Sequence, residues 1–293
     1  MLSQMPSRKT KEKVIEYIFL VIASFSILII FFIFMFLFKE SLPAFRQIGW
    51  QIFSADFHGK FGLGAAIIGS LLATTGALII AFPIGIGSAI FLSEVSPSWL
   101  RRLLKPIIEV LAGIPSVIYG FIGAILLVPY LANSFNMSSG YSLLAGGMII
   151  GVMTLPIVVS ISDDSLKAVP HDVKEASLAL GATPWQTIKK VTFPAASSGI
   201  FAAATLGVGK AIGETMAVLM VVSAITTAPD PLFDVFQSGP VLTALIAGHM
   251  GEAYGLKVNV LFAAGVFLFI IVGALSVISD IMQHRVEKKF MGR

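Results

Sequence analysis

The sequence predicts an all-α membrane protein with six transmembrane helices. Of its 293 residues, 56% are apolar and only 12% are charged, and the mean hydropathy is +0.92, far from the composition of a soluble domain. Six apolar runs are each long enough for a helix to cross about 30 Å of hydrocarbon. The runs cover residues 14–38, 65–92, 107–131, 142–161, 199–225 and 260–281.

The first run, 14–38, follows four basic residues, as the core of a secretory signal does. Its uncharged stretch, 17–38, is too long for a signal core, and large Phe, Met and Leu side chains occupy the end where small residues would mark a cleavage site. We therefore expect a retained spanning helix. Because it lacks Gly and Pro and is rich in Phe and Ile, we place it at the lipid-facing periphery.

The basic residues flank the apolar runs, which indicates membrane topology rather than nucleic-acid binding. If the N-terminus is cytoplasmic, 15 of the 20 Lys and Arg residues fall in cytoplasmic segments and four in outer segments. The positive-inside rule then places both termini in the cytoplasm. This topology gives a cytoplasmic tail at 1–13, a core of five further transmembrane helices at 65–281 and a basic cytoplasmic tail at 282–293.

Glycine and proline recur in the second and third runs, for example at Gly85 and Gly87 and at Gly120 and Gly123. Small residues let two backbones approach closely. We therefore expect these helices to pack against other helices rather than to face lipid alone.

The longest polar cytoplasmic segment, 162–198, predicts two short helices joined by a tight turn. Pro170 suits the first turn of one helix, and Gly181 suits the left-handed position just past its end. One face of this helix is apolar and needs a partner or the membrane surface to cover it. That face carries Val173, Ala176 and Leu180.

A second helix follows the turn. Thr183 is its predicted cap, Pro184 takes its first position, Gln186 completes a capping box, and Pro194 stops it. From the pattern alone, the two helices are either a hairpin lying against the bundle or a docking element for a cytoplasmic protein.

The spacing within this segment favours docking. Glu175 and Ala176, then Gly181 and Ala182, then Pro194 thirteen positions after the glycine, resemble the EAA loop of ABC importer permeases. In that family the loop forms a coupling helix seated in a groove of the ATPase subunit. The resemblance therefore implies a type I ABC importer permease fold, the MetI-like fold, and assigns ATPase coupling to these residues.

Two opposite charges lie inside the fifth apolar run. Lys210 and Glu214 are four residues apart and therefore on one helical face. A charge there costs at least about 2.5 kcal/mol on insertion scales, so it must face a cavity or a partner. One interpretation is a buried ion pair that orients helices. In the other, Lys210 attracts an anion in a translocation path, Glu214 keeps it protonated, and the hydroxyls of Thr205 and Thr215 add hydrogen bonds to the ligand.

The stretch 206–218 closely resembles the matching helix of phosphate importer permeases, and its ending is similar to the C-type subunit of the Pst system, PstC. The family usually has arginine at the position of Lys210. Lysine lacks the planar two-pronged contact of arginine with phosphate, although it binds anions as a point charge. Further matches are Glu40, Ser41, Pro43, Ala44, Gly69, Ser70, Ile114, Pro115, Ser116, Tyr119 and Gly120.

This resemblance implies a permease subunit of an ATP-driven phosphate importer. The subunit would form half of the translocation pathway and work by alternating access. The resemblance also implies its partners, which are a homologous PstA-like permease, a PstB-like ATPase dimer, an extracytoplasmic PstS-like phosphate-binding protein and the lipid bilayer. ATP and Mg would be bound by the ATPase, so no cofactor is expected in this chain. The expected location is a bacterial or archaeal plasma (inner) membrane.

Other functions stay open from the sequence. One alternative substrate is sulfate, molybdate or another oxyanion, and one alternative function is that of a secondary transporter that uses Lys210 and Glu214 as an ion relay. An intramembrane enzyme is disfavoured because the sequence contains no phosphate-binding loop, His-Glu-x-x-His pair or Gly-x-Ser-x-Gly motif. We accordingly predict no catalytic residue and no metal site, and the chain has no cysteine.

Overall fold

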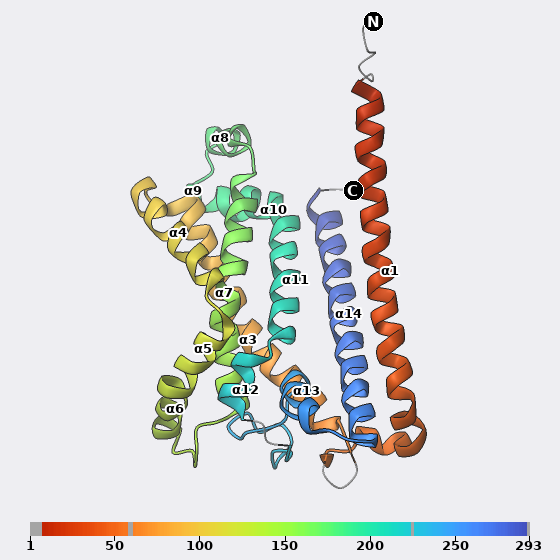
Figure 1. The fold of residues 1–293 in the computed structure, drawn as a ribbon. Coiled ribbons are helices and arrows are strands. Elements are labelled where there is room, and N and C mark those ends of the chain that lie inside the picture. The colour runs from red at the N-terminus through yellow and green to blue at the C-terminus, as the bar shows by residue number, and fades with distance from the viewer. Residues whose placement is uncertain (1–7, 58–60, 224–225, 292–293) are drawn as a thin grey trace, which may run out of the picture.

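The computed structural model is a helical bundle and describes residues 8–57, 61–223 and 226–291 (Figure 1). Two long helices, α1 (Arg8–Ile48) and α14 (Leu256–Met291), run side by side. Two others, α3 (Gly64–Ile90) and α7 (Leu143–Lys167), pack along each other and form the centre of the bundle. The bundle therefore has a tightly packed core and a separate outer pair of helices.

Shorter helices surround this frame. The helix α8 lies at the end of the bundle where α1 begins and α14 finishes, whereas α6, α12 and α13 lie toward the other end (Figure 1). We call these the α8 end and the α13 end. The shorter helices are α4 (Ser98–Gly113), α5 (Ser116–Ile122), α6 (Val128–Phe135), α8 (His171–Ala179), α9 (Pro184–Thr187), α10 (Phe193–Ala195), α11 (Ser197–Gly213), α12 (Met216–Val222) and α13 (Leu242–His249).

Tighter or wider helical turns connect several of these helices without a loop. Wide π-helical turns continue α3 at Phe91–Val95, join α5 to α6 at Gly123–Leu127 and join α9 to α10 at Ile188–Thr192. Narrow 3₁₀ turns follow α1 at Gly49–Phe53 and α13 at Met250–Glu252.

The predicted all-α fold class is confirmed. Among the described residues, five helices are long and apolar enough to cross a membrane. A sixth crossing is obtained if α11 is counted together with the helix Pro184–Ala195, from which it is bent by 67°. The bundle thus has the five or six membrane crossings of a multi-pass protein.

The predicted third span, 107–131, is not one helix. The chain is extended at Ile114 and Pro115, so that the amphipathic helix α4 ends there and the apolar helix Ser116–Phe135 begins. Pro115 explains the break, because a proline lacks a backbone N–H and disfavours the helical conformation in the residue before it. The predicted fifth span, 199–225, is interrupted as well, at the candidate site described below.

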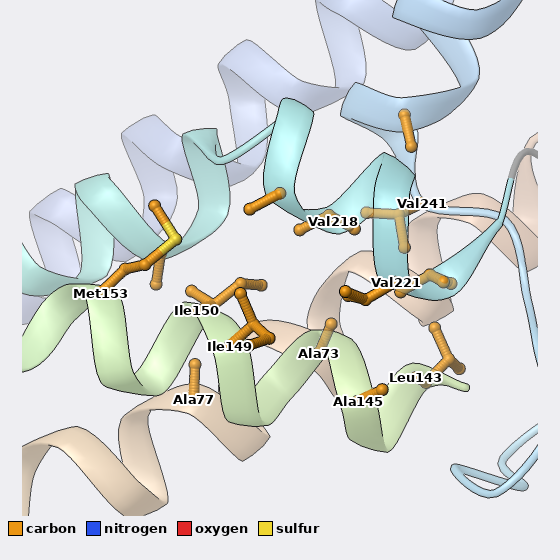
Figure 2. Packing of buried hydrophobic residues seen from close by; sticks show 14 of the residues in the cluster. Ala73, Ala77, Leu143, Ala145, Ile149, Ile150, Met153, Val218, Val221 and Val241 are labelled. Atoms are coloured by element: carbon orange, nitrogen blue, oxygen red, sulfur yellow. The ribbon is translucent and has the colours of Figure 1, made fainter. Parts of the chain in front are cut away.

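Small residues bring α3 and α7 together. A Cβ atom on Gly147 would lie 3.2 Å from the carbonyl oxygen of Ala73, and one on Gly151 would lie 3.2 Å from that of Ala77. Such close backbone approach is typical of helix pairs in membranes. The helix α12 covers the same core from another side (Figure 2). The core includes Leu143, Ile149 and Ile150 of α7 and Val218 and Val221 of α12.

The apolar side chains of α1 are almost all exposed from Tyr17 to Phe38. This helix meets α14 through ring contacts, with 5.0 Å between the ring centres of Phe34 and Phe269. Because apolar side chains exposed on all sides of a helix are stable only against lipid or another chain, α1 is the outermost helix of the bundle.

We expect Gly69→Ala to destabilise the protein. A Cβ atom at Gly69 would lie 2.2 Å from the carbonyl oxygen of Pro240, and the neighbouring Ser70 Oγ accepts a hydrogen bond of 2.9 Å from the amide of Leu242. The backbone must shift to accept the methyl group, at a cost of about 1–3 kcal/mol. Thermal unfolding in detergent measures this as a lower midpoint.

The matched control is Gly87→Ala in the same helix, where a Cβ atom would meet nothing within 4 Å. Alanine is the better helix former, so this variant should unfold at the wild-type midpoint or slightly above it. Equal midpoints for the two variants would contradict the close approach at Gly69.

Candidate functional site

The fifth predicted span is interrupted at Glu214. The helix α11 ends at Gly213, Glu214 has an extended backbone with φ −69° and ψ 130°, and α12 starts at Met216. The Oε1 atom of Glu214 accepts hydrogen bonds from the amides of Thr215 (3.2 Å) and Ala217 (3.4 Å). The carboxylate therefore satisfies the amides that the helix break exposes at the start of α12.

A residue distant in sequence completes this arrangement. The hydroxyl of Thr243 in α13 donates a hydrogen bond of 2.8 Å to the carbonyl oxygen of Glu214. Both the side chain and the backbone of Glu214 are thus bonded, and its side chain is only 5% exposed. Because backbone groups inside a membrane need internal partners, these bonds make the break tolerable.

Lys210 pairs with the same glutamate. Its Nζ atom lies 3.2 Å from Oε2 of Glu214, while its side chain is 40% exposed. The prediction that the two charges share one helical face is consistent with this contact, although Glu214 lies just past the helix end rather than within the helix. An ammonium group has three donors. Lys210 therefore keeps hydrogen-bonding capacity on its exposed side.

The exposed side of α11 forms a stripe of mostly small residues around Lys210. A Cβ atom on Gly209 or Gly213 would meet nothing within 4 Å. On the opposite side of the helix, a Cβ atom on Gly207 would lie 3.2 Å from the methyl group of Thr154 in α7. One side of α11 is thus fixed against the core and the other is open. The exposed residues are Ala202, Leu206, Gly209, Lys210 and Gly213.

The two predicted threonines are separated in the structure. Thr215 lies at the break beside the ion pair, and its hydroxyl donates to the carbonyl oxygen of Gly213 at 3.2 Å. The hydroxyl of Thr205 instead donates to the carbonyl oxygen of Phe201 at 3.0 Å and contacts Ser279 of α14. The structure therefore groups Lys210, Glu214 and Thr215, and it places Thr205 at the α11–α14 contact.

At the α8 end, residues 171–195 form a helical hairpin, which we call the α8 hairpin. Gly181 has the positive φ of +83° expected of the residue past the end of α8. Thr183 and Gln186 form the predicted capping box. The amide of Thr183 donates to Oε1 of Gln186 at 2.9 Å, and the amide of Gln186 donates to Oγ1 of Thr183 at 3.3 Å. The predicted turn and cap are confirmed.

Two proline positions differ from the prediction. Pro170 precedes the first turn of α8 rather than lying in it. Pro194 lies within the final turn, and the helix ends at Ala195. The π-helical turn at Ile188–Thr192 just before Pro194 explains this, because proline has no N–H and a wide turn accommodates the missing hydrogen bond.

The outer surface of the α8 hairpin carries large exposed apolar side chains. Leu180 is 90% exposed and Trp185 is 63% exposed. A hollow of about 440 Å³ lies between α8 and the following helix. Exposed apolar surface of this kind marks a contact site for another chain or for the membrane surface. The hollow is lined by Val173, Ala176, Ser177, Leu180, Ala182, Gln186, Lys190 and Val191.

Glu175 also lies on this outer surface. Its Oε1 atom lies 3.0 Å from Nδ1 of His171, and both side chains are exposed. The structure thus brings Glu175, Ala176, Gly181 and Ala182 together around one turn. It places Pro194 at the far end of the hairpin, next to the start of α11.

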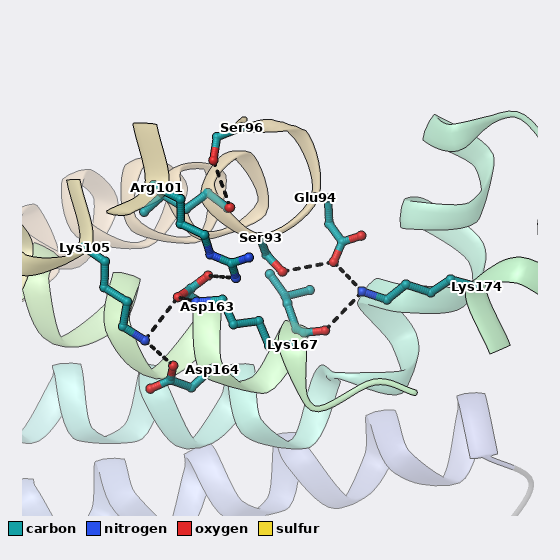
Figure 3. A network of polar contacts seen from close by, with 11 residues as sticks. Ser93, Glu94, Ser96, Arg101, Lys105, Asp163, Asp164, Lys167 and Lys174 are labelled. Carbon is teal, nitrogen blue, oxygen red and sulfur yellow. Dashed lines mark hydrogen bonds and ion pairs between the residues drawn. The ribbon is translucent and has the colours of Figure 1, made fainter. Parts of the chain in front are cut away.

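The sequence analysis missed a buried charge cluster at the α8 end (Figure 3). The polar segment was expected to begin at Ser162, but α7 continues to Lys167 and buries Asp163. Asp163 lies 3.4 Å from both Arg101 and Lys105 and also pairs with Lys167. The spacing of Asp163 and Lys167, four residues apart, is the sequence signal that would have extended the helix.

The cluster attaches α4 to α7. Lys105 also bonds to Asp164 at 2.5 Å, and this hydrogen bond raises the pKa of Lys105 against the opposing effect of partial burial. A buried carboxylate requires such compensation, because an unpaired charge in a low-dielectric environment is strongly unfavourable.

Comparison with known proteins identifies the kind of bundle. Residues 81–292 match the family described as the inner membrane component of binding-protein-dependent transport systems. The chain belongs to this family of permeases. Permeases of this family are the membrane components of ABC transporters and are not themselves catalytic.

Relatives share most of their length with this permease. It is 41% identical over 226 residues to the probable ABC transporter permease protein YqgH of Bacillus subtilis, covering 76% of this chain and 72% of that one. It is 34% identical to the phosphate transport system permease protein PstC of Pasteurella multocida, covering 78% and 77%. This chain is therefore an ABC importer permease subunit with similarity to phosphate permeases.

A solved structure supports the fold. The permease matches a chain of the inward-facing MetNI methionine ABC transporter with a TM-score of 0.61 and 22% identity, covering 76% of this chain and 95% of that one. The expected MetI-like permease fold is confirmed.

The turn at Gly181 offers a test of the α8 hairpin. We expect Gly181→Val to loosen it, because a β-branched residue at φ +83° costs roughly 1–2 kcal/mol. Hydrogen exchange of the purified chain should then be faster at the amides of α8 and α9. Gly181→Asn is the matched control, since asparagine tolerates the left-handed conformation. Unchanged exchange in the valine variant would contradict this geometry.

Proposed function

We propose that this permease carries inorganic phosphate inward and forms half of the pathway of an ATP-driven importer. The observation that carries the proposal is the position of Lys210. It is a half-exposed ammonium on the open side of α11, inside an apolar bundle, with its counter-ion buried beside it. Such a positive charge suits a pathway for an oxyanion, and the similarity to PstC supports phosphate as that oxyanion.

Glu214 has two roles in this proposal. Its carboxylate fixes the start of α12 and at the same time pairs with Lys210 at the break. Since the carboxylate is already bonded to two amides, it attracts Lys210 without closing off the exposed side of the ammonium. The phosphate then meets one cation and neighbouring neutral donors, which favours passage over tight retention.

The stripe around Lys210 faces outward from this chain, so we assign the other half of the pathway to a homologous permease. Substrate would be delivered by an extracytoplasmic phosphate-binding protein at the α13 end. The α8 end would lie in the cytoplasm, because the predicted basic segments at both termini, in α4 and in the α8 hairpin gather there.

The α8 hairpin would receive the force. Its exposed Leu180 and Trp185 fit a groove in an ATPase subunit, and an ATPase dimer would serve the two permeases. ATP binding would bring the ATPases together and turn the bundle outward, and hydrolysis would return it inward. The chain would thus alternate between two states with energy supplied by its partners.

Position 210 is lysine and not arginine, and lysine lacks the two-pronged contact with phosphate. The substrate test therefore includes other oxyanions. The test uses the complete transporter reconstituted in proteoliposomes. Radiolabelled phosphate is added on the side of the membrane where the binding protein docks, and ATP is supplied on the side of the ATPases. We expect ATP-dependent phosphate uptake that an excess of sulfate or molybdate leaves unchanged. Uptake of sulfate or molybdate in place of phosphate would overturn the substrate assignment.

We expect Lys210→Ala to lower phosphate uptake by about ten- to a hundredfold, because a hydrogen bond to a charged group contributes roughly 1.5–3 kcal/mol. Lys210→Arg is the control and should retain uptake. Since the alanine variant leaves Glu214 buried without its cation, the variant Lys210→Ala/Glu214→Gln separates binding from assembly. Size-exclusion chromatography checks that each complex is intact. Wild-type uptake in an intact Lys210→Ala complex would return this lysine to a structural role.

A further inference from the structure

The helix α8 has two chemically different sides. Glu175 and His171 lie on its outer side, where both are exposed. The neighbouring Lys174 points toward the bundle, and its side chain is only 18% exposed. A lysine next to the glutamate of a docking loop would ordinarily be assigned to the docking surface. In this structure it is an internal contact of the permease.

Lys174 joins α8 to two core helices (Figure 3). Its Nζ atom lies 2.7 Å from Oε1 of Glu94 and donates a weaker bond of 3.5 Å to the carbonyl oxygen of Leu166. Glu94 belongs to the wide turn that ends α3, and Leu166 belongs to the last turn of α7. One ammonium group therefore contacts the ends of both helices.

The glutamate of this pair is itself held in place. Its side chain is 11% exposed, and Oε1 also accepts a hydrogen bond of 3.0 Å from the hydroxyl of Ser93. An ion pair that is mostly shielded from water and fixed by a further hydrogen bond is much stronger than a surface pair. The contact between α8 and α3 is thus directional as well as attractive.

Each partner of the pair belongs to a unit that is held together by its own contacts. Within the α8 hairpin, the hydroxyls of Ser177 and Thr187 lie 3.0 Å apart and connect its two helices. In the core, the small residues of α3 and α7 hold these helices in close contact. A displacement of the hairpin that is carried through Lys174 would therefore move α3 and α7 together.

We propose that Lys174 and Glu94 are positioning residues that transmit movement of the α8 hairpin to the α3–α7 core. This inference rests on the proposed coupling to an ATPase, and it adds the contact inside the permease through which that coupling acts. The ion pairs of Asp163 at the same end of the bundle connect α4 to α7 instead.

The test compares Lys174→Met and Glu94→Gln with the charge exchange Glu94→Lys/Lys174→Glu. In the reconstituted transporter, each single variant should retain ATP hydrolysis and lose at least about half of the substrate carried per ATP. The charge exchange should restore much of this ratio, because it rebuilds the pair with reversed polarity. The control is Arg102→Met, which removes an exposed basic side chain of α4, outside the hairpin, and should keep the wild-type ratio.

A second measurement needs no transported substrate. In the purified permease, Lys174→Met should speed hydrogen exchange at the α8 amides by about tenfold, the factor that corresponds to about 1.4 kcal/mol. The charge exchange should again reverse the effect, and Arg102→Met should not produce it. A wild-type complex that fails to carry phosphate would therefore overturn the proposed function. The exchange measurement would still test whether Lys174 and Glu94 hold α8 against the core.

Two results would overturn the proposal. One is a wild-type ratio of transport to hydrolysis in both single variants together with unchanged exchange in α8. The other is a charge-exchange variant that is as defective as the two single changes combined, which would mean that the residues act independently.

Discussion

A helix interrupted inside a membrane exposes backbone groups that lipid cannot satisfy, and the bonds around Glu214 meet this constraint. Its carboxylate accepts from the amides of Thr215 and Ala217, and Thr243 bonds to its carbonyl oxygen. The same carboxylate holds Lys210, so one buried side chain makes both the break and the neighbouring positive charge tolerable. The proposed pathway depends on this, because the buried carboxylate gives Lys210 a fixed counter-ion while the open side of α11 leaves the ammonium exposed.

The two functional ends of the chain are related through the core. The α8 hairpin exposes apolar side chains on its outer side, while Lys174 joins its inner side to the ends of α3 and α7. These two helices pack through glycine and alanine, and α12 lies against them with its first turn fixed by Glu214 (Figure 2). A continuous set of packed elements therefore connects the hairpin with the break. Close packing of this kind transmits small displacements because it has few alternative arrangements.

Local chemistry explains what the sequence could predict. The capping box of Thr183 and Gln186 and the left-handed Gly181 depend on neighbours a few residues away, and both are present. The interruption at Glu214 depends on Thr243, 29 positions later, and the run 199–225 contains no proline to indicate it. Asp163 is buried by cations of α4 some sixty positions earlier, so its burial could not be read from the polar sequence around it. Long-range partners thus account for most of what the pattern missed.

The central claim is that this bundle is moved by a nucleotide-driven partner at the α8 hairpin. Placing a photoreactive amino acid at Leu180, the most exposed apolar side chain of the hairpin, in the purified and assembled transporter tests this most directly. The account predicts that light attaches this position to the ATPase subunit and that the yield changes when ATP is added. An assembled complex in which this position attaches only to lipid or detergent, with and without ATP, would contradict it.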